Sequence, residues 1–240
     1  MKVAYFDCFS GIAGDMILGA LIDLGVDINY LKREISKLGL AGYNIDVKKV
    51  NKNNIVASDV YITVDEKQPH RTLTDINKII GKSSLNQEVK DLSKKIFLKL
   101  AEAEGKVHKV DVEKVHFHEV GAVDSIIDII GAAIGVNILG ITEFYCSSLP
   151  LGSGYVICQH GKIPLPAPAT RELLKDAPTY QTNSGHEMVT PTGAAVITTI
   201  CSNFGDMPSI KIDRIGYGAG KIKSSQKGVL KVVIGDLEKK

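Results

Sequence analysis

The chain has 240 residues, of which 44% are hydrophobic and 23% charged, and its formal net charge is +2. This balance is typical of a soluble globular protein of one large or two small domains, and it gives no electrostatic case for a nucleic acid or an anionic membrane as partner. The four cysteines form no CxxC pair, no apolar run reaches the ~20 residues of a membrane span, and Asp7 interrupts the N-terminal run too early for a signal peptide. We therefore expect a cytoplasmic protein with reduced thiols.

The N-terminal part of the chain alternates between strand and helix patterns. The apolar spacing predicts strands over 3–6, 44–50 and 55–64 and helices over 16–24 and 28–38. The turn DCFSGIAGD joins the first strand to the first helix, and the polar NKNN makes a hairpin of the last two strands. This order of strand, two helices and hairpin favours an α+β fold over a regular doubly wound sheet.

The middle of the chain has a helical pattern. Apolar residues recur at helical spacing from Thr72 to about Val107, and a further helix is predicted from about Val120 to Leu139. We therefore predict that residues 71–139 form a helical subdomain or insertion in an α+β core of residues 1–70 and 140–240.

The C-terminal part returns to mixed character. TEFYCSSL predicts a strand, and a proline-rich segment then leads into a short helix at ATRELLK. Thr190 is predicted to cap a helix that has Pro191 in its first position. IKIDRIGYGAG and GVLKVVIG read as two strands, with the glycines of IGYGAG interpreted as a turn signal. The expected fold class is α+β, a mixed sheet with packed helices and a helical insertion.

The turn DCFSGIAGD has two interpretations. Gly11 and Gly14 permit close approach by a ligand, and the following helix offers free N–H groups and a positive dipole end to a phosphate or carboxylate. Asp7 ends the first strand, where ligand-facing acids are common in α/β proteins. The structural alternative is a tight turn with Asp15 as a helix cap, and the segment matches neither a Walker A nor a GxGxxG pattern.

A second anion site is predicted at the helix that begins after Thr190. Its N-terminus again offers free N–H groups, with threonine hydroxyls beside them. The residues expected to bind the anionic group of a ligand, taken from both segments, are Asp7, Ser10, Gly11, Gly14, Asp15, Thr190, Thr192 and Gly193.

The stretch VHFHEVGAVDSIID, residues 115–128, carries the residue types that a divalent metal prefers. His116 and His118 share a face if the segment is extended, while Asp124 and Asp128 share a face of the next helix among apolar neighbours. A buried carboxylate without a partner costs several kcal/mol or stays protonated, so a cation should meet this face. That cation is either a metal ion or a lysine or arginine from the preceding helices, and spacing alone leaves both open.

The segment CQHGKIPLPAPAT places soft and borderline ligands in a loop that its prolines make rigid. Singly, each of these residues is more often structural. The expected metal ligands from both segments are His116, His118, Glu119, Asp124, Asp128, Cys158 and His160.

Six longer motifs resemble one known family. FDCFSGIAGDM, LAEAEGKVH, VHFHEVGAVDSIIDIIGAAIG, PLGSGYVICQHGKIPLPAPAT, TPTGAA and IGYGAG occur in an order and spacing similar to those of the LarC family. The resemblance covers nearly the whole chain. It implies a nickel chelatase, or cyclometallase, of the lyase class that inserts Ni(II) into pyridinium-3,5-bisthiocarboxylic acid mononucleotide, forming the nickel-pincer cofactor of lactate racemase.

The resemblance also implies roles and partners. Nickel becomes bonded to two sulfurs and a ring carbon, so the ring proton must be accepted by a base, for which we expect His118 or Glu119. The family depends on CTP and on Mn(II) or Mg(II), associated with a C-terminal domain that we expect to be absent from this chain. We therefore expect that domain as a partner, and the homo-oligomeric state is open. The alternative is a non-catalytic nickel carrier or scaffold for a catalytic partner domain.

Overall fold

The computed structural model describes the chain apart from residues 65–68, 70, 118–121, 159–160, 222–227 and 239–240. The helices are α1 Gly14–Asp23, α2 Ile28–Ser36, α3 Leu73–Lys82, α4 Gln87–His108, α5 Val123–Ile138, α6 Pro168–Leu173 and α7 Pro191–Ile200, with a 3₁₀ turn at Val112–Lys114. The strands of the main sheet are β1 Lys2–Asp7, β2 Tyr43–Lys52, β3 Ile55–Val64, β6 Glu143–Cys146, β11 Asn203–Phe204, β12 Ile210–Ala219 and β13 Val229–Leu237. Short strand pairs are formed by β4 Arg71–Thr72 with β5 His116–Phe117, β7 Leu149–Leu151 with β10 Thr179–Gln181, and β8 Tyr155–Cys158 with β9 Gly161–Pro164.

The main sheet is mixed, which confirms the expected α+β fold class. In the described residues its strand order is β11-β6-β1-β13-β12-β3-β2. Strand β1 runs parallel to β6 and antiparallel to β13, and β12 runs antiparallel to β13. Because β1 lies in the middle of the sheet, the turn that follows it leaves from a position flanked by strands on both sides.

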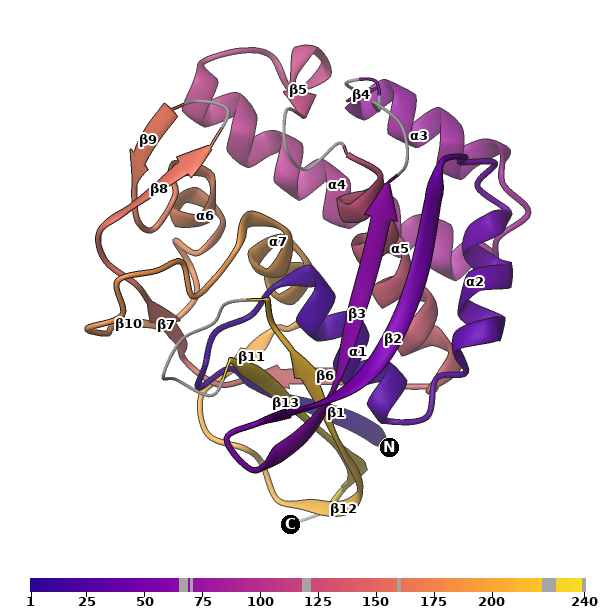
Figure 1. Ribbon diagram of the computed structural model, residues 1–240, viewed down its shortest axis with the longest axis vertical. Helices are drawn as coiled ribbons and strands as arrows, with labels where there is room; N and C mark the ends of the chain where they lie inside the picture. The colour runs from indigo at the N-terminus through magenta and orange to yellow at the C-terminus, as the bar shows by residue number, and fades with distance from the viewer. Residues whose placement is uncertain (65–68, 70, 118–121, 159–160, 222–227, 239–240) are drawn as a thin grey trace.

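The predicted hairpin forms as a long pair of strands, β2 and β3 (Figure 1). Asn53 and Asn54 at its tip have φ angles of 51° and 67°. Two consecutive residues with positive φ match the right-handed twist of the strands, and asparagine tolerates that conformation better than most residues. The NKNN signal was therefore correctly interpreted.

The glycines of IGYGAG were wrongly interpreted as a turn signal, because they lie inside β12. A Cβ on Gly218 would overlap the carbonyl oxygen of Met16 and lie 2.6 Å from the amide nitrogen of Ala20. A Cβ on Gly216 would lie 2.6 Å from the carbonyl oxygen of Ala20. Residues 216 and 218 share one face of the strand, so their missing side chains let the backbone of α1 rest directly on the sheet.

On its other side α1 packs against α5, and glycines again set the contact. Gly131 and Gly135 lie one turn apart on α5 and accept the side chains of Leu18 and Leu21. Helices α4 and α7 complete this layer, and their apolar side chains join one core with those of α1, α5 and the sheet. The helices of residues 71–139 share that core, and their independence as a subdomain stays a prediction. No helix in the described part of the chain has the length and apolar character needed to cross a bilayer.

The close approach of α1 to β12 predicts that a side chain added at Gly218 destabilises the protein. Gly218→Ala should lower the free energy of unfolding by about 3 kcal/mol or more, the upper end of overpacking costs, because the new methyl group meets backbone atoms that cannot rotate away. Urea denaturation followed by circular dichroism measures the effect. Gly81→Ala in α3, where a Cβ meets nothing within 4 Å, is the matched control and should be neutral or stabilise by up to about 1 kcal/mol. Equal effects of the two substitutions would contradict the packing described.

Candidate functional site

The two segments predicted to bind an anion lie side by side. The backbone of Ile12, in the turn between β1 and α1, bonds like a strand to the segment before α7: its N–H donates to the carbonyl of Met188 at 2.8 Å, and its carbonyl accepts from the N–H of Thr190 at 3.1 Å. Gly11 has a φ of +95°, and a Cβ there would overlap the Met188 carbonyl oxygen. The first glycine of the motif therefore serves the contact between the two segments, which together form one site.

A cavity of about 240 Å³ opens where these segments meet. Its lining combines carboxylates, hydroxyls, a lysine, a histidine and two methionines: Ser10, Ala13, Asp15, Met16, His186, Glu187, Met188, Thr190, Gly220, Lys221 and Gly228. Ser10, Asp15 and Thr190 were predicted from the sequence, whereas His186, Glu187 and Lys221 were missed. His186 and Glu187 lie shortly before the predicted TPTG segment, and this closeness in sequence is the signal that could have identified them.

Lys221 is held at the edge of the cavity by groups far away in sequence. Its Nζ lies 2.6 Å from Oδ1 of the buried Asp59 and 3.8 Å from Oδ2 of Asp15. It also donates to the carbonyl of Val60 and lies 4.1 Å from the centre of the Tyr61 ring. Since 162 residues separate Lys221 from Asp59, no local pattern in the sequence could have found this pairing.

Asp15 and Asp128 are two carboxyls whose pKa values are raised by burial. Asp15, in the first turn of α1, lines the cavity, and its Oδ1 accepts the N–H of Met16 at 2.8 Å. Burial raises its pKa, although Lys221 opposes that shift. Asp128 lies behind it on α5, where the absence of a side chain at Gly14 leaves room: a Cβ there would be 2.5 Å from Oδ2 of Asp128.

The Asp128 carboxyl forms no salt bridge with any residue that the structure describes. Its Oδ1 is inaccessible to solvent and has no hydrogen-bond partner among the described residues. Burial raises the pKa of Asp128 well above its usual range, and the charges of Asp15 and Asp124 raise it further, with only Lys221 opposing. Asp124, one turn earlier, is exposed and accepts the N–H of Ser125 at 2.8 Å. Neither acid is in a salt bridge with a lysine or arginine of the preceding helices in the described part of the chain.

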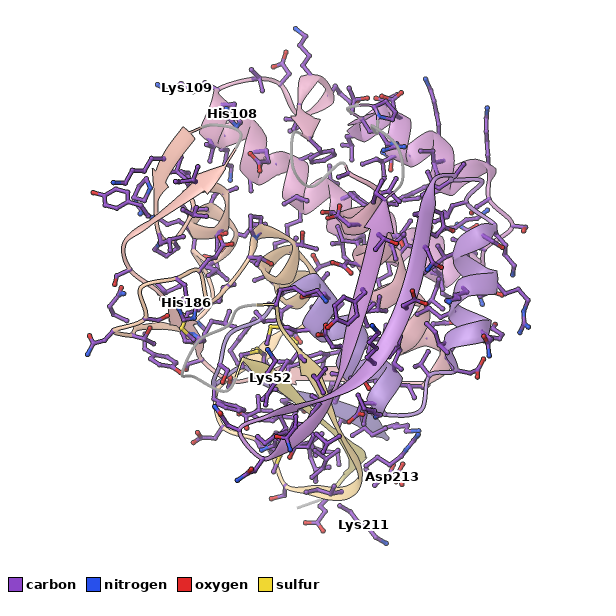
Figure 2. The ribbon with its side chains drawn as sticks, viewed as in Figure 1. Lys52, His108, Lys109, His186, Lys211 and Asp213 are labelled. Carbon is purple, nitrogen blue, oxygen red and sulfur yellow. The ribbon has the colours of Figure 1, made fainter. Side chains whose placement is uncertain are left out.

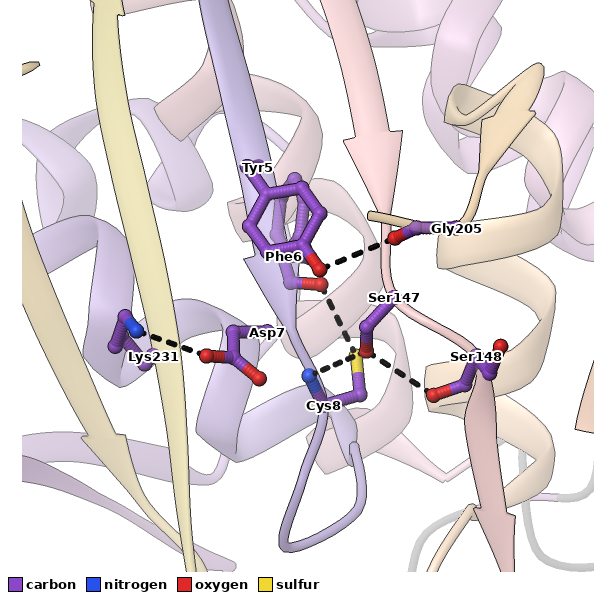
Figure 3. Close-up of polar contacts among 8 residues, drawn as sticks. All are labelled: Tyr5, Phe6, Asp7, Cys8, Ser147, Ser148, Gly205 and Lys231. Atoms are coloured by element: carbon purple, nitrogen blue, oxygen red, sulfur yellow. Dashed lines mark hydrogen bonds and ion pairs between the residues drawn. The ribbon is translucent and has the colours of Figure 1, made fainter. Parts of the chain in front are cut away.

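Asp7 was predicted to face the ligand but takes part in joining strands (Figure 3). Its Oδ2 lies 2.8 Å from Nζ of Lys231, its register partner on β13. Just beyond it, the Cys8 N–H donates to Oγ of Ser147 at 3.0 Å, which in turn donates to the carbonyl of Ser148. Asp7 is not among the residues that line the cavity.

The remaining predicted anion-binding residues have structural partners. Thr190 caps α7 as expected, because its Oγ1 accepts the N–H of Gly193 at 3.1 Å. Thr192 is buried in the same first turn. Helix α1, by contrast, begins after Ala13 with no side-chain cap at that position, and of the N–H groups in its first turn that of Met16 already donates to Asp15, so a ligand or water can meet only the others. His186 lies between β10 and α7 (Figure 2), and its ring is held by a 2.9 Å hydrogen bond with Oγ of Ser184.

Most of the predicted metal ligands have side chains outside the described part of the structure. His118, Glu119 and His160 lie outside the described residues, as do the side chains of His116 and Cys158, whose backbones lie in β5 and β8. Among the side chains that are described, no three histidines, cysteines, aspartates or glutamates gather as a metal site. Of the predicted ligands whose side chains are described, Asp128 lies against Gly14 at the start of α1, next to the cavity-lining Asp15, but does not line the cavity itself.

The enclosed Asp128 predicts an unusual dependence of stability on pH. The folded chain keeps a proton on Asp128 at pH values where the unfolded chain, with an aspartate pKa near ~3.9, has lost it, so stability falls as the pH rises above that value. Each pH unit in this window costs about 1.4 kcal/mol, or roughly 3–6 °C in Tm for a chain of this size.

Asp128→Asn imitates the protonated acid and should remove this cost. In metal-free protein we expect the variant to unfold at a higher temperature than the wild type at pH 8, with the advantage shrinking towards pH 4. Thermal unfolding followed by circular dichroism across this range measures it. Asp91→Asn, at an exposed carboxylate on α4, should leave the profile unchanged. Parallel profiles for the wild type and Asp128→Asn would show that Asp128 is ionised in the folded protein.

Comparison with known proteins shows the family of the chain. Residues 4–240 match the family of nickel insertion proteins. A putative nickel insertion protein of Dictyoglomus thermophilum is 49% identical over 237 residues, covering 99% of this chain and 61% of the relative. Relatives from Acetivibrio thermocellus, at 46% identity, and Desulfitobacterium hafniense, at 47%, carry the name pyridinium-3,5-bisthiocarboxylic acid mononucleotide nickel insertion protein, and the alignments cover 100% and 99% of this chain and 62% and 59% of those relatives.

The chain thus spans about three-fifths of the length of the curated relatives it matches. No solved structure is significantly similar to it. Because the match runs through β1, the cavity-lining segments and both final strands, the chain belongs to the nickel insertion protein family, the LarC family.

Proposed function

We propose that this chain takes part in inserting nickel into pyridinium-3,5-bisthiocarboxylic acid mononucleotide, the substrate in the names of its relatives. The observation that carries the proposal is the cavity at the β1–α1 turn, built from two of the motifs that define the resemblance. In this role the enzyme is a nickel chelatase of the lyase class, and the product is the cofactor of lactate racemase.

The phosphate of the mononucleotide binds, in this proposal, where the two segments meet. Ser10 and Thr190 supply hydroxyls there, and the uncapped start of α1 supplies N–H groups and the positive end of the helix dipole. Lys221 adds an ammonium group whose remaining N–H is free to meet a ligand, since an ammonium has three donors and two of them serve Asp59 and Val60.

Nickel is the cargo of this reaction. We propose that it is held by the ligand set predicted from the sequence, His116, His118, Glu119, Asp124, Asp128, Cys158 and His160. When nickel bonds to the ring carbon, the C–H bond breaks and its proton passes to His118 or Glu119 as base. CTP and Mn(II) or Mg(II) act through the C-terminal domain, which is the expected partner. A non-catalytic nickel carrier is the alternative function.

Nickel binding to the HxH segment is directly testable. Anaerobic calorimetric titration of the purified chain with Ni(II) should show stoichiometric binding, and the double variant His116→Ala/His118→Ala should weaken it by at least about 100-fold, because each imidazole is a preferred ligand. His108→Ala, at the end of α4, is the matched control and should retain the wild-type affinity. Unchanged binding in the double variant would remove these histidines from the site.

The pH dependence of this binding has a fixed sign. Imidazole must be neutral to bind a metal, so the affinity for nickel should fall as the pH drops through the histidine range near ~6.5. Repeating the titration between pH 5.5 and 8 measures this. An affinity that stayed constant over that range would point to carboxylate ligands alone.

A further inference from the structure

Strand β1 has the residue pattern of a strand that is covered on both faces. Its four central residues, VAYF, are all apolar and all buried, and most residues of the neighbouring β13 are buried as well. A strand with one solvated face alternates between apolar and polar residues, whereas a continuous apolar run indicates cover on both sides. The sequence of β1 therefore indicates a layer on each face of the sheet.

The helices supply one of these layers. Ala4 and Phe6 share their core with α1, α4, α5 and α7, so the odd-numbered residues of β1 point to the other face. Paired residues of neighbouring strands share a face. The register therefore places one row across four strands on that other face: Tyr145 in β6, Tyr5 in β1, Val233 in β13 and Ile215 in β12. In the next row, Val3 and Ile212 both pair with Gly235.

The described residues cover only the centre of this second face. Tyr5 is 8% exposed, and its hydroxyl donates at 3.1 Å to the carbonyl of Gly205, in the loop between β11 and β12. At the margins, Met207, Ile212 and Ile215 are exposed by 42%, 48% and 42%. Exposed apolar side chains that gather on one surface commonly mark a place that another protein covers.

A hollow of about 460 Å³ extends this surface towards the end of β13. Tyr145 and Met207 line it together with Leu237 and Glu238. We call the surface formed by Tyr145, Met207, Ile212 and Ile215 the open face. It lies away from the cavity, since Figure 2 shows Lys211, at the start of β12, far from the cavity residue His186.

The curated relatives contain sequence that has no counterpart in this chain. The alignment with the Acetivibrio thermocellus relative covers 100% of this chain and 62% of the relative, which leaves about two-fifths of that protein unmatched. In the proposed function this part is a C-terminal domain, which follows the residues that align with the end of β13. Because Leu237 and Glu238 line the hollow, such a domain is tethered beside the open face and meets it at high effective concentration.

We propose that the open face is the docking surface for the C-terminal domain of the family's longer members, and that an apolar helix of that domain covers it. The inference rests on the proposed function, because it gives a place to the partner that this function expects. Four strands spaced by about 4.8 Å make a face about 14 Å wide, which matches a helix of about 10–12 Å diameter. This helix supplies the second layer that the apolar run of β1 indicates.

Docking can be measured with the chain as it is. The probe is the part of the Dictyoglomus thermophilum relative that lies outside its alignment with this chain, produced as a separate protein. Calorimetric titration should show saturable binding of one copy. Ile215→Lys and, separately, Met207→Lys should each weaken it by at least about tenfold, because each places a charge among the apolar groups of the interface.

A matched control separates docking from a general effect of a new lysine. Leu98 on α4 is 45% exposed, close to the value for Ile215, but belongs to the helical layer. Leu98→Lys should bind the probe like the wild type, and circular dichroism confirms that each variant is folded. Nickel binding by Ile215→Lys should also equal that of the wild type, because the open face holds none of the expected metal ligands.

Footprinting gives a second measurement that does not need the probe to fold alone. In a fusion of this chain with the same part of the relative, hydroxyl radicals should oxidise Met207 at least about threefold more slowly than in the chain alone. Tyr155, 62% exposed on β8, is the internal reference and should react equally in both proteins.

Weakening by both open-face variants but not by Leu98→Lys, with protection of Met207 in the fusion, supports the inference. Equal binding by all variants, or an unprotected Met207 in the fusion, overturns it. Self-association of the chain alone that Ile215→Lys abolishes also overturns it, because a second copy then covers the face. None of these results changes the nickel titration of the wild type, which tests the proposed function separately.

Discussion

The contact between the backbone of α1 and the backbone of β12 sets the positions of the other parts of the site. Side chains normally separate a helix from the sheet that it covers, but Gly216 and Gly218 leave no side chain between them. Gly19 on the helix matches this, because a Cβ there would lie 2.4 Å from the Ser58 carbonyl oxygen. Helix α5 packs against the opposite side of α1, where Gly131 and Gly135 leave room for the side chains of Leu18 and Leu21. A helix confined on both faces cannot shift along its axis without steric clashes, so the position of its first turn is fixed.

That fixed first turn explains why an energetically unfavourable group persists. Gly14 leaves space for the carboxyl of Asp128, and Asp15 directs its own carboxyl to the cavity. Two carboxyls with raised pKa values close together cost stability, and Lys221 opposes the shift at both, helped at Asp15 by the N–H of Met16. Such costs are commonly found where a protein binds a ligand or performs chemistry, because the ligand or the reaction restores the balance. The chain belongs to a family of nickel insertion proteins, and a divalent cation suits an acidic site.

The end of β1 shows the opposite behaviour, because Asp7, the N–H of Cys8 and the hydroxyl of Ser147 all have partners. Asp7 pairs with Lys231, and Ser147 links the β1–α1 turn to the strand beside it. Cys8, Cys146 and Cys201 meet in the core nearby, with 3.6 Å between the first two sulfurs, and burial raises the pKa values of Cys8 and Cys201. These three thiols are free and buried. These contacts hold the end of β1 in place. The carboxyls of Asp15 and Asp128, whose pKa values are raised, lie at the first turn of α1, which follows β1 in the chain.

The sequence by itself determined the elements and the chemical types of the site. Apolar spacing located α1, α2, α4 and the hairpin because burial of one face imposes a period on the chain, and the Thr190 cap followed from the donors that a helix start leaves unpaired. The role of the glycines in β12, the pairing of Asp7 with Lys231 and the arrival of Lys221 and Asp128 at Asp15 were decided only by the tertiary structure. Each depends on groups more than 100 residues apart, and the energy of such a contact is set by distance in space and by desolvation, neither of which has a local pattern in the chain.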